Sequence, residues 1–162
     1  MINGFKTKTF SLDEVNIFSV EYGEGPLIIM VHGWPESWYS WRHQIKPLGD
    51  LGYKVLAIDV RGYGKSSKPK EVEKYDMISL VNDVLGIISE EDEEKAILIG
   101  HDWGAPICWN TAALHPNKVR AVIGLSVPHA RRGAISNSEL WRNMYKDNFF
   151  YQTYFEKEGI AE

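Results

Sequence analysis

The chain has 162 residues, of which 44% are hydrophobic and 25% are charged, a balance typical of a soluble globular protein. Its net charge of −4 argues against nucleic acid or an anionic membrane surface as a partner. The single cysteine, Cys108, cannot form an internal disulfide, so a reducing cytoplasm is the expected compartment. No apolar signal segment opens the chain, and the longest aliphatic run, residues 27–31, is too short to span a membrane.

Apolar runs bounded by turn signals alternate with helix-like segments along most of the chain. The expected strands cover residues 5–10, 15–22, 27–31, 53–58, 96–100 and 119–125. The expected helices cover residues 38–51, 78–89 and 105–115, and the acidic run at 90–94 is interpreted as a solvated connection. Two opening strands followed by strand–helix alternation predict an α/β fold with a mostly parallel, doubly wound sheet.

The loop at residues 62–66 contains Gly-Lys-Ser but does not match a phosphate-binding loop. Such a loop requires a glycine five positions before Gly64, and that position is Asp59. A nucleotide cofactor is therefore not expected. The five histidines lie far apart in the sequence and no second cysteine accompanies Cys108, so no metal site is expected.

Aromatic residues are concentrated near the end of the sequence. Seven of them fall between Trp141 and Phe155. Trp141, Tyr145 and Phe149 recur at helical spacing, which predicts an aromatic helix face that packs on a core.

The pentapeptide Gly100-His101-Asp102-Trp103-Gly104 lies between an expected strand and an expected helix. A G-x-nucleophile-x-G sequence in that context is typical of a sharp turn that exposes its central residue for nucleophilic attack. An aspartate that attacks saturated carbon forms an ester, which water can hydrolyse, whereas a serine would form a stable ether. Asp102 therefore indicates attack on an epoxide or a haloalkane. The alternative is that Asp102 only caps the following helix.

A second motif, His32-Gly33-Trp34-Pro35, directly follows the expected strand that ends at Val31. Two such motifs in this order, each at the end of an apolar strand, are hard to ascribe to chance. Together with further segments they resemble the soluble epoxide hydrolases, which have the α/β-hydrolase fold. The similar segments are residues 32–42, 61–67, 100–104 and 151–155.

The resemblance extends over essentially the whole chain and implies its domain organisation. Residues 1–130 would form the N-terminal part of the α/β-hydrolase core, with about six of its eight strands. Residues 131–162 would begin a helical cap that is incomplete. The family's triad acid, its histidine and a second cap tyrosine would lie beyond Glu162. An apolar edge strand left open at residues 119–125 would favour self-association.

The resemblance also implies roles for individual residues, and no cofactor or metal. Asp102 would attack a ring carbon of a small-molecule epoxide, while Tyr151 would donate a proton or hydrogen bond to the departing oxygen. The backbone N–H groups of Trp34 and Trp103 would then hold the oxyanion that forms when water attacks the ester. The substrate pocket would include His32, Pro35, Trp103 and Tyr151.

Two other functions remain open on the sequence. A haloalkane dehalogenase shares the aspartate elbow and the tryptophan after it, but its resemblance normally brings an asparagine where Trp34 stands. A non-catalytic protein that binds a ligand or partner is favoured by the poor match of the histidines after Asp102 to a general base. His115 falls at the end of a helix, and His129 follows the sixth strand instead of the eighth.

Overall fold

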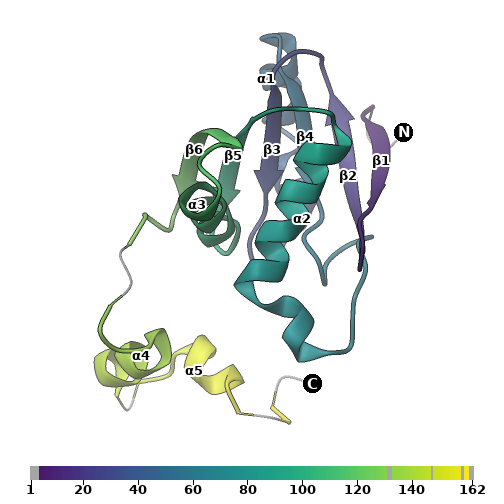
Figure 1. Cartoon of the computed structure of the whole chain (residues 1–162). Coiled ribbons are helices and arrows are strands. Elements are labelled where there is room, and N and C mark those ends of the chain that lie inside the picture. The colour runs from purple at the N-terminus through teal and green to yellow at the C-terminus, as the bar shows by residue number, and fades with distance from the viewer. Residues whose placement is uncertain (1–3, 131–132, 147, 158, 161–162) are drawn as a thin grey trace. The chain divides into compact units, whose positions relative to one another are not determined.

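The computed structural model describes residues 4–130, 133–146, 148–157 and 159–160 (Figure 1). The chain divides into two compact units, Met1–His129 and Ala130–Glu162. The strands of the first unit are β1 (Lys6–Ser11), β2 (Asn16–Tyr22), β3 (Leu27–Val31), β4 (Lys54–Ile58), β5 (Ala96–His101) and β6 (Val119–Leu125). Its helices are η1 (Trp38–Trp41), α1 (Ile45–Asp50), η2 (Val72–Tyr75), α2 (Met77–Glu90) and α3 (Gly104–Leu114).

Within the described part of the first unit, the six strands form one sheet in the order β1-β2-β4-β3-β5-β6. β2 pairs antiparallel with both β1 and β4, whereas β4, β3, β5 and β6 run parallel. Consecutive parallel strands need crossover connections, and α1, α2 and α3 lie in those from β3 to β4, from β4 to β5 and from β5 to β6. The predicted mostly parallel α/β-hydrolase sheet is confirmed.

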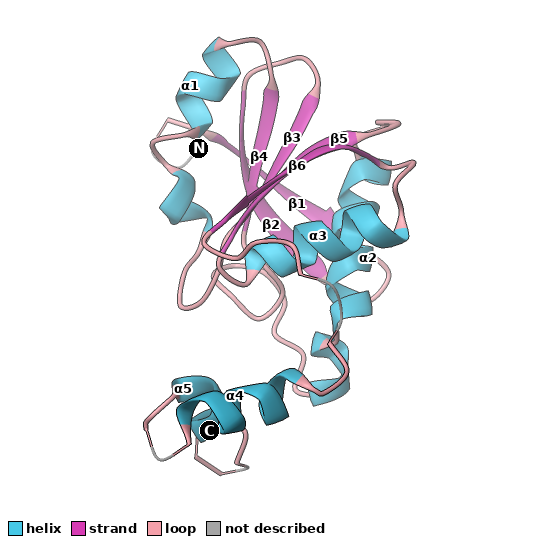
Figure 2. Cartoon of the chain, turned by 90° about the vertical axis from the view of Figure 1, so that its left-hand side faces the viewer, coloured by secondary structure: helices cyan, strands magenta, loops and turns pink. Residues whose placement is uncertain are grey.

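Helices cover both faces of the sheet, which makes it doubly wound (Figure 2). Alternate residues of the buried strand β3 enter two separate cores. Leu27, Ile29 and Val31 pack in the core that includes side chains of α2 and α3. Ile28 and Met30 pack in the other core, which includes side chains of η1 and α1.

The helix expected over residues 38–51 is wrong as a single element. The structure has the 3₁₀-helix η1, a turn at residues 42–44, and then α1. Pro47 explains the break, because it has no N–H to donate to the carbonyl of His43 and its ring would clash with that carbonyl. Pro47 is tolerated where it stands, in the first turn of α1, because N–H groups there have no intrahelical partner.

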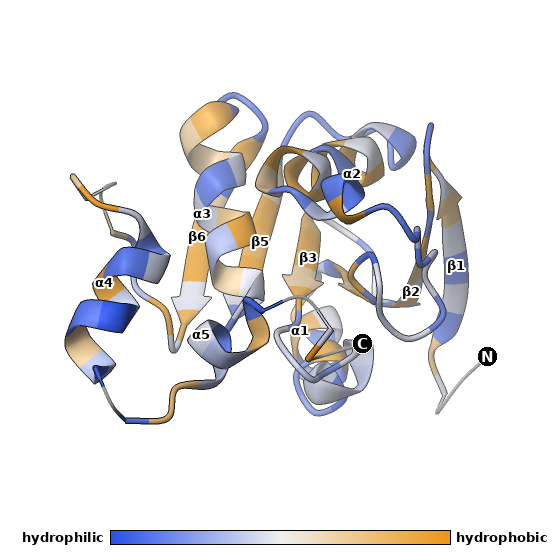
Figure 3. Cartoon of the chain, turned by 90° about the horizontal axis from the view of Figure 1, so that it is seen from below, coloured by the Kyte–Doolittle hydropathy of each residue, from blue (hydrophilic) through white to orange (hydrophobic). Residues whose placement is uncertain are grey.

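The last strand of the sheet, β6, has one neighbour and is only partly covered. Ile123 and Leu125 keep 47% and 42% of their surface exposed although they lie in a strand that Figure 3 shows as largely hydrophobic. By contrast, β3 and β5 are buried over nearly their whole length. None of the helices in the described ranges is both long and apolar enough to cross a lipid bilayer.

The second unit contains α4 (Asn137–Tyr145) and α5 (Tyr151–Phe155). Its ring contacts centre on Phe150, which stacks on Tyr145 at 4.2 Å and lies 5.4 Å from Trp141 between ring centroids. The predicted helical face through Phe149 is wrong, because α4 ends at Tyr145 and the next residue, Lys146, has a φ of 46°. Phe149 lies outside the helix and is 74% exposed.

Candidate active site

The two sequence motifs meet at the carboxyl ends of neighbouring strands. β3 and β5 pair in parallel, with Val31 opposite Gly100, so the segments after them leave the sheet side by side. The chain passes from β3 to β4 on one side and then returns to β5 on the other side of β3. Such a switch in strand order is where open α/β sheets bind their ligands.

Asp102 occupies a tight, strained turn between β5 and α3. Its φ of 49° places it in the left-handed region, which residues other than glycine rarely adopt. A Cβ on Gly100 would lie 2.4 Å from the carbonyl oxygen of Gly104, and one on Gly104 would lie 2.0 Å from that of Val31. Glycine is therefore required on both sides of the turn, as the motif predicts.

The Asp102 carboxylate faces the loop after β3. The backbone N–H of Trp34 donates a hydrogen bond of 2.9 Å to Oδ1 of Asp102. A Cβ on Gly33 would lie 2.4 Å from the Asp102 Cβ, so the loop backbone packs directly against this side chain. The residue at the N-cap of α3 is Trp103, and that cap has no side-chain hydrogen bond. Helix capping therefore does not explain Asp102.

Trp103 follows Asp102 and directly precedes the first residue of α3. The first N–H groups of a helix have no partner within it, so the Trp103 N–H belongs to a set of donors at this end of α3. Trp34 and Trp103 are 42% and 46% exposed, although both are large apolar residues. One of these residues hydrogen-bonds the Asp102 carboxylate through its backbone, and the other follows Asp102 in the chain.

His32 is a structural residue of this loop. Its ring is 1% exposed, and its Nε2 accepts a 3.0 Å hydrogen bond from the N–H of Val60. Its Nδ1 lies 2.7 Å from the carbonyl oxygen of Gly33 and must donate to it, which makes the imidazole neutral. Burial lowers the pKa of His32 and so favours the same neutral form. The rings of His32 and Tyr63 pack in a T-shaped arrangement with their centroids 5.1 Å apart. Pro35 follows Trp34 through a cis peptide bond.

Asp59, at the end of β4, ties the site loop to the neighbouring glycine-rich loop. Its carboxylate accepts hydrogen bonds from the N–H groups of Trp38 (2.9 Å) and Lys65 (2.8 Å). A Cβ on Gly64 would lie 2.0 Å from the same carboxylate. The Gly-Lys-Ser sequence thus packs around an aspartate: the Lys65 N–H donates to the Asp59 carboxylate, and the Ser66 hydroxyl donates to the Asp59 carbonyl oxygen. The sequence did not assign Asp59 this role, although its position directly after a buried strand was the available signal.

Tyr151 begins α5 in the second unit. It is half-buried, and its hydroxyl oxygen accepts a 3.3 Å hydrogen bond from Nε2 of Gln152. Each unit is defined by itself, so the predicted approach of Tyr151 to the epoxide oxygen stays a prediction.

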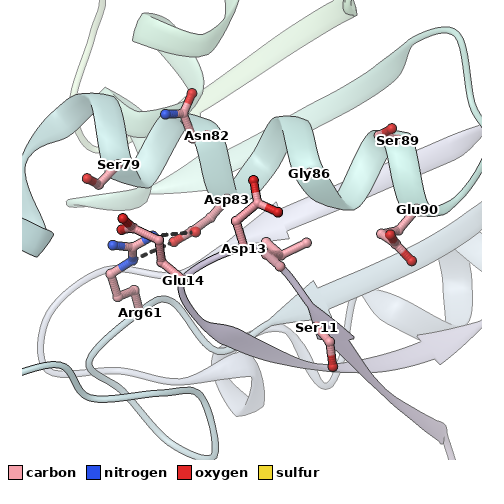
Figure 4. Close-up of a pocket in the computed structure, with 11 residues that line it drawn as sticks. Ser11, Asp13, Glu14, Arg61, Ser79, Asn82, Asp83, Gly86, Ser89 and Glu90 are labelled. Atoms are coloured by element: carbon pink, nitrogen blue, oxygen red, sulfur yellow. Dashed lines mark hydrogen bonds and ion pairs between the residues drawn. The ribbon is translucent and has the colours of Figure 1, made fainter.

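A separate cavity of about 450 Å³ lies along α2 (Figure 4). Most of its charged lining residues are carboxylates, and the charge of the Arg61 guanidinium is balanced by an ion pair with Asp83. Arg61 donates to both carboxylate oxygens of Asp83, at 2.7 and 2.9 Å, and to the carbonyl oxygen of Lys74 at 2.7 Å. The pair joins the loop after β4 to α2, so we assign it a structural role.

The mostly parallel sheet, the strained aspartate just after β5 and the N–H donor from the neighbouring loop define an α/β hydrolase. A family model described as alpha/beta hydrolase fold matches residues 26–157, and the chain belongs to this family. Among curated relatives, epoxide hydrolase A of Mycobacterium tuberculosis is 46% identical over 150 residues, which cover 91% of this chain and 47% of the relative. Bifunctional epoxide hydrolase 2 of Rattus norvegicus is 42% identical over 149 residues, which cover 91% of this chain and 26% of the relative.

The crystal structure of epoxide hydrolase A from Mycobacterium thermoresistibile superposes with a TM-score of 0.93 at 46% identity. The match covers 97% of this chain and 50% of that one. The resemblance to epoxide hydrolases is thereby confirmed. The chain spans about half the length, or less, of the relatives it matches.

Proposed function

We propose that this chain opens epoxides through a covalent alkyl ester on Asp102. The observation that carries the proposal is the Asp102 carboxylate in a left-handed turn, with the Trp34 N–H 2.9 Å from Oδ1. The relatives named epoxide hydrolases supply the substrate class. A carboxylate nucleophile suits an epoxide because the alkyl ester it forms can later be hydrolysed.

The hydrogen bond at Oδ1 leaves Oδ2 of Asp102 to attack. Oδ2 forms a bond to a ring carbon, the carbon–oxygen bond of the epoxide breaks, and its electron pair goes to the departing oxygen. Tyr151 would donate a proton to that oxygen, a contribution of roughly 10²–10⁴-fold. The product of this step is an alkyl ester whose carbonyl oxygen is Oδ1.

The same geometry suits hydrolysis of the ester. Water adds to the carbonyl carbon of the Asp102 ester, and negative charge develops on Oδ1. The Trp34 N–H already points at this atom, and the Trp103 N–H would be the second donor. One such donor contributes on the order of 10²–10³-fold. Collapse of the adduct breaks the bond to the alkyl oxygen, releases a vicinal diol and regenerates the carboxylate.

Within these 162 residues, we propose that the first step is better supported than the second. The second step needs a general base, and the histidines after Asp102 are His115 and His129. His115 follows the last residue of α3, an 11-residue helix that begins just after Asp102, so roughly 16 Å of helix separates them. The ring of His129 packs at 5.7 Å against Trp109 of α3. The chain by itself should therefore stall as the ester.

The decisive experiment exposes the chain to styrene oxide and measures its intact mass. We expect one added epoxide mass, and peptide mapping should place it on Asp102. Asp102→Asn should abolish the adduct, while the matched variant Asp92→Asn should not, because Asp92 shares the left-handed conformation with a φ of 54° but follows α2 in a different loop. Cys108 should stay unlabelled, because its thiol is buried and burial raises its pKa. Label on Cys108 in place of Asp102 would contradict the proposal.

Two further outcomes distinguish the alternatives. Chloride release from a simple chloroalkane, without reaction of the epoxide, would establish the dehalogenase alternative in place of ours. Steady turnover of styrene oxide to diol would contradict the stalled ester and make His129 the first residue to substitute.

A further inference from the structure

Glu36 connects the two segments that form the candidate site. It follows Pro35 in the loop after β3, and one carboxylate oxygen accepts a 3.1 Å hydrogen bond from the N–H of Gly33. The same carboxylate also contacts His101, whose Nδ1 lies 3.2 and 3.3 Å from its two oxygens. Glu36 therefore binds its own loop and the last residue of β5 at once.

These contacts are made by the residues next to the hydrogen-bonded pair Trp34 and Asp102. Gly33 and His101 directly precede Trp34 and Asp102, the two residues joined by the 2.9 Å bond. The loop and the strand end are thus joined twice at adjacent positions, once by Trp34 with Asp102 and once by Glu36 with His101. A backbone turn from Glu36 N–H to the Gly33 carbonyl oxygen, at 3.2 Å, closes the loop itself.

We propose that Glu36 and His101 are positioning residues that hold the Gly33–Trp34 peptide with the Trp34 N–H directed at Oδ1 of Asp102. Glu36 fixes one amide of the loop, which restricts the rotation that would turn the next amide away from the carboxylate. Their side chains keep 24% and 35% of their surface exposed, so the pair is solvated but ordered by three contacts. Any effect on reaction rates rests on the proposed function; the effect on the loop does not.

The loop is tested by hydrogen–deuterium exchange of a peptide covering residues 31–37, followed by mass spectrometry. In Glu36→Ala we expect the Gly33 and Trp34 amides to exchange about tenfold faster, because one hydrogen bond to a charged acceptor is lost. Glu36→Gln keeps an oxygen that accepts from Gly33 and should stay within about threefold of the unmodified chain. Asp50→Ala removes another exposed ion pair, Lys46–Asp50, and should change nothing here.

The reaction supplies an independent readout. The ester on Asp102 should be hydrolysed about tenfold more slowly by alkaline buffer in Glu36→Ala, because a loosened Trp34 N–H stabilises the oxyanion less. His101→Ala should slow it in the same direction. If styrene oxide never labels Asp102 in the unmodified chain, the proposed function fails while the exchange rates still test the loop. Unchanged exchange in Glu36→Ala, or equal acceleration in Asp50→Ala, would overturn the positioning role.

Discussion

Replacing Gly33 with alanine should damage the site without touching a charged group. Gly33 has no positive φ, so alanine can adopt its backbone conformation. The new methyl group, however, would lie 2.4 Å from the Cβ and 2.5 Å from Oδ1 of Asp102. The Cβ contact would have to lengthen by about 1 Å to reach ordinary van der Waals separation. Rotation of the Asp102 side chain cannot provide this, because its Cβ is fixed to the backbone, so the loop after β3 must move away from Asp102 and take the Trp34 N–H with it.

A displacement of this size is large compared with the tolerance of the site. The Trp34 N–H to Oδ1 distance is 2.9 Å, and a further ~1 Å would remove the hydrogen bond. Misplacement of a reacting group by about 1 Å can cost on the order of 10²-fold in rate. Overpacking costs about 1–3 kcal/mol in a closed core, and Gly33 borders a partly exposed side chain, so the loss of stability should fall at the lower end.

The rate of formation of the styrene oxide adduct measures this effect, with thermal unfolding as the control for stability. Gly133→Ala is the matched variant, because its Cβ would meet nothing nearer than 3.6 Å. We expect Gly33→Ala to react about 10²-fold more slowly while its unfolding temperature falls by only a few degrees. A Gly33→Ala chain that reacts as fast as Gly133→Ala would refute the close packing on which the mechanism depends.

Three further predictions concern other parts of the chain. Tyr151→Phe should slow adduct formation by about 10²-fold and Tyr154→Phe much less, and equal rates in the two variants would remove the assignment. Because the pKa of His32 is lowered on folding, stability should be complete above the ordinary histidine pKa and decline as pH falls below about 6.5; melting temperatures that are flat from pH 7.5 to 5.5 would contradict this. The exposed Ile123 and Leu125 should drive self-association of the chain, and Ile123→Lys should weaken it. Sedimentation velocity measures the oligomeric state, and a monodisperse monomer of the unmodified chain would rule self-association out.

Local sequence patterns predicted the sheet well because its strands are apolar runs with clear ends. Residues 27–31 and 119–125 are strands with the bounds that the sequence indicated. The prediction of one helix over residues 38–51 was wrong because a single proline, Pro47, outweighs the apolar spacing around it. The acidic run also concealed a buried contact: the side chain of Glu91 is 1% exposed and pairs with Lys8 and Lys54.

Glu91 shows why such contacts escape a reading of sequence. Burial alone would raise the pKa of its carboxyl, but hydrogen bonds from Lys54 and Lys8 outweigh burial and lower it. The lysines lie 37 and 83 residues away in the chain, on β4 and β1. A run of acidic residues looks the same in a sequence whether or not one of them meets cations from distant strands.

In the candidate site, too, residues of local motifs could be predicted from the sequence, and contacts between distant residues could not. Asp102 and Trp34 could be predicted because each belongs to a motif at the end of an apolar strand, and parallel neighbouring strands bring such ends together. The supporting contacts of Glu36 with His101, and of Asp59 with two loops, depend on side chains that meet only after the sheet has formed. No spacing rule in one dimension encodes them.

The residues that hold Asp102 in place fall into two groups, which should respond differently to substitution. Glycines at positions 33, 100 and 104 act through contacts that backbone packing leaves no room to relax, since an added Cβ would fall 2.0–2.5 Å from the nearest atoms. Glu36 and His101 act through solvated hydrogen bonds, which water can partly replace. Backbone packing should therefore determine whether Asp102 can react at all, and the charged pair should adjust how well its oxyanion is held.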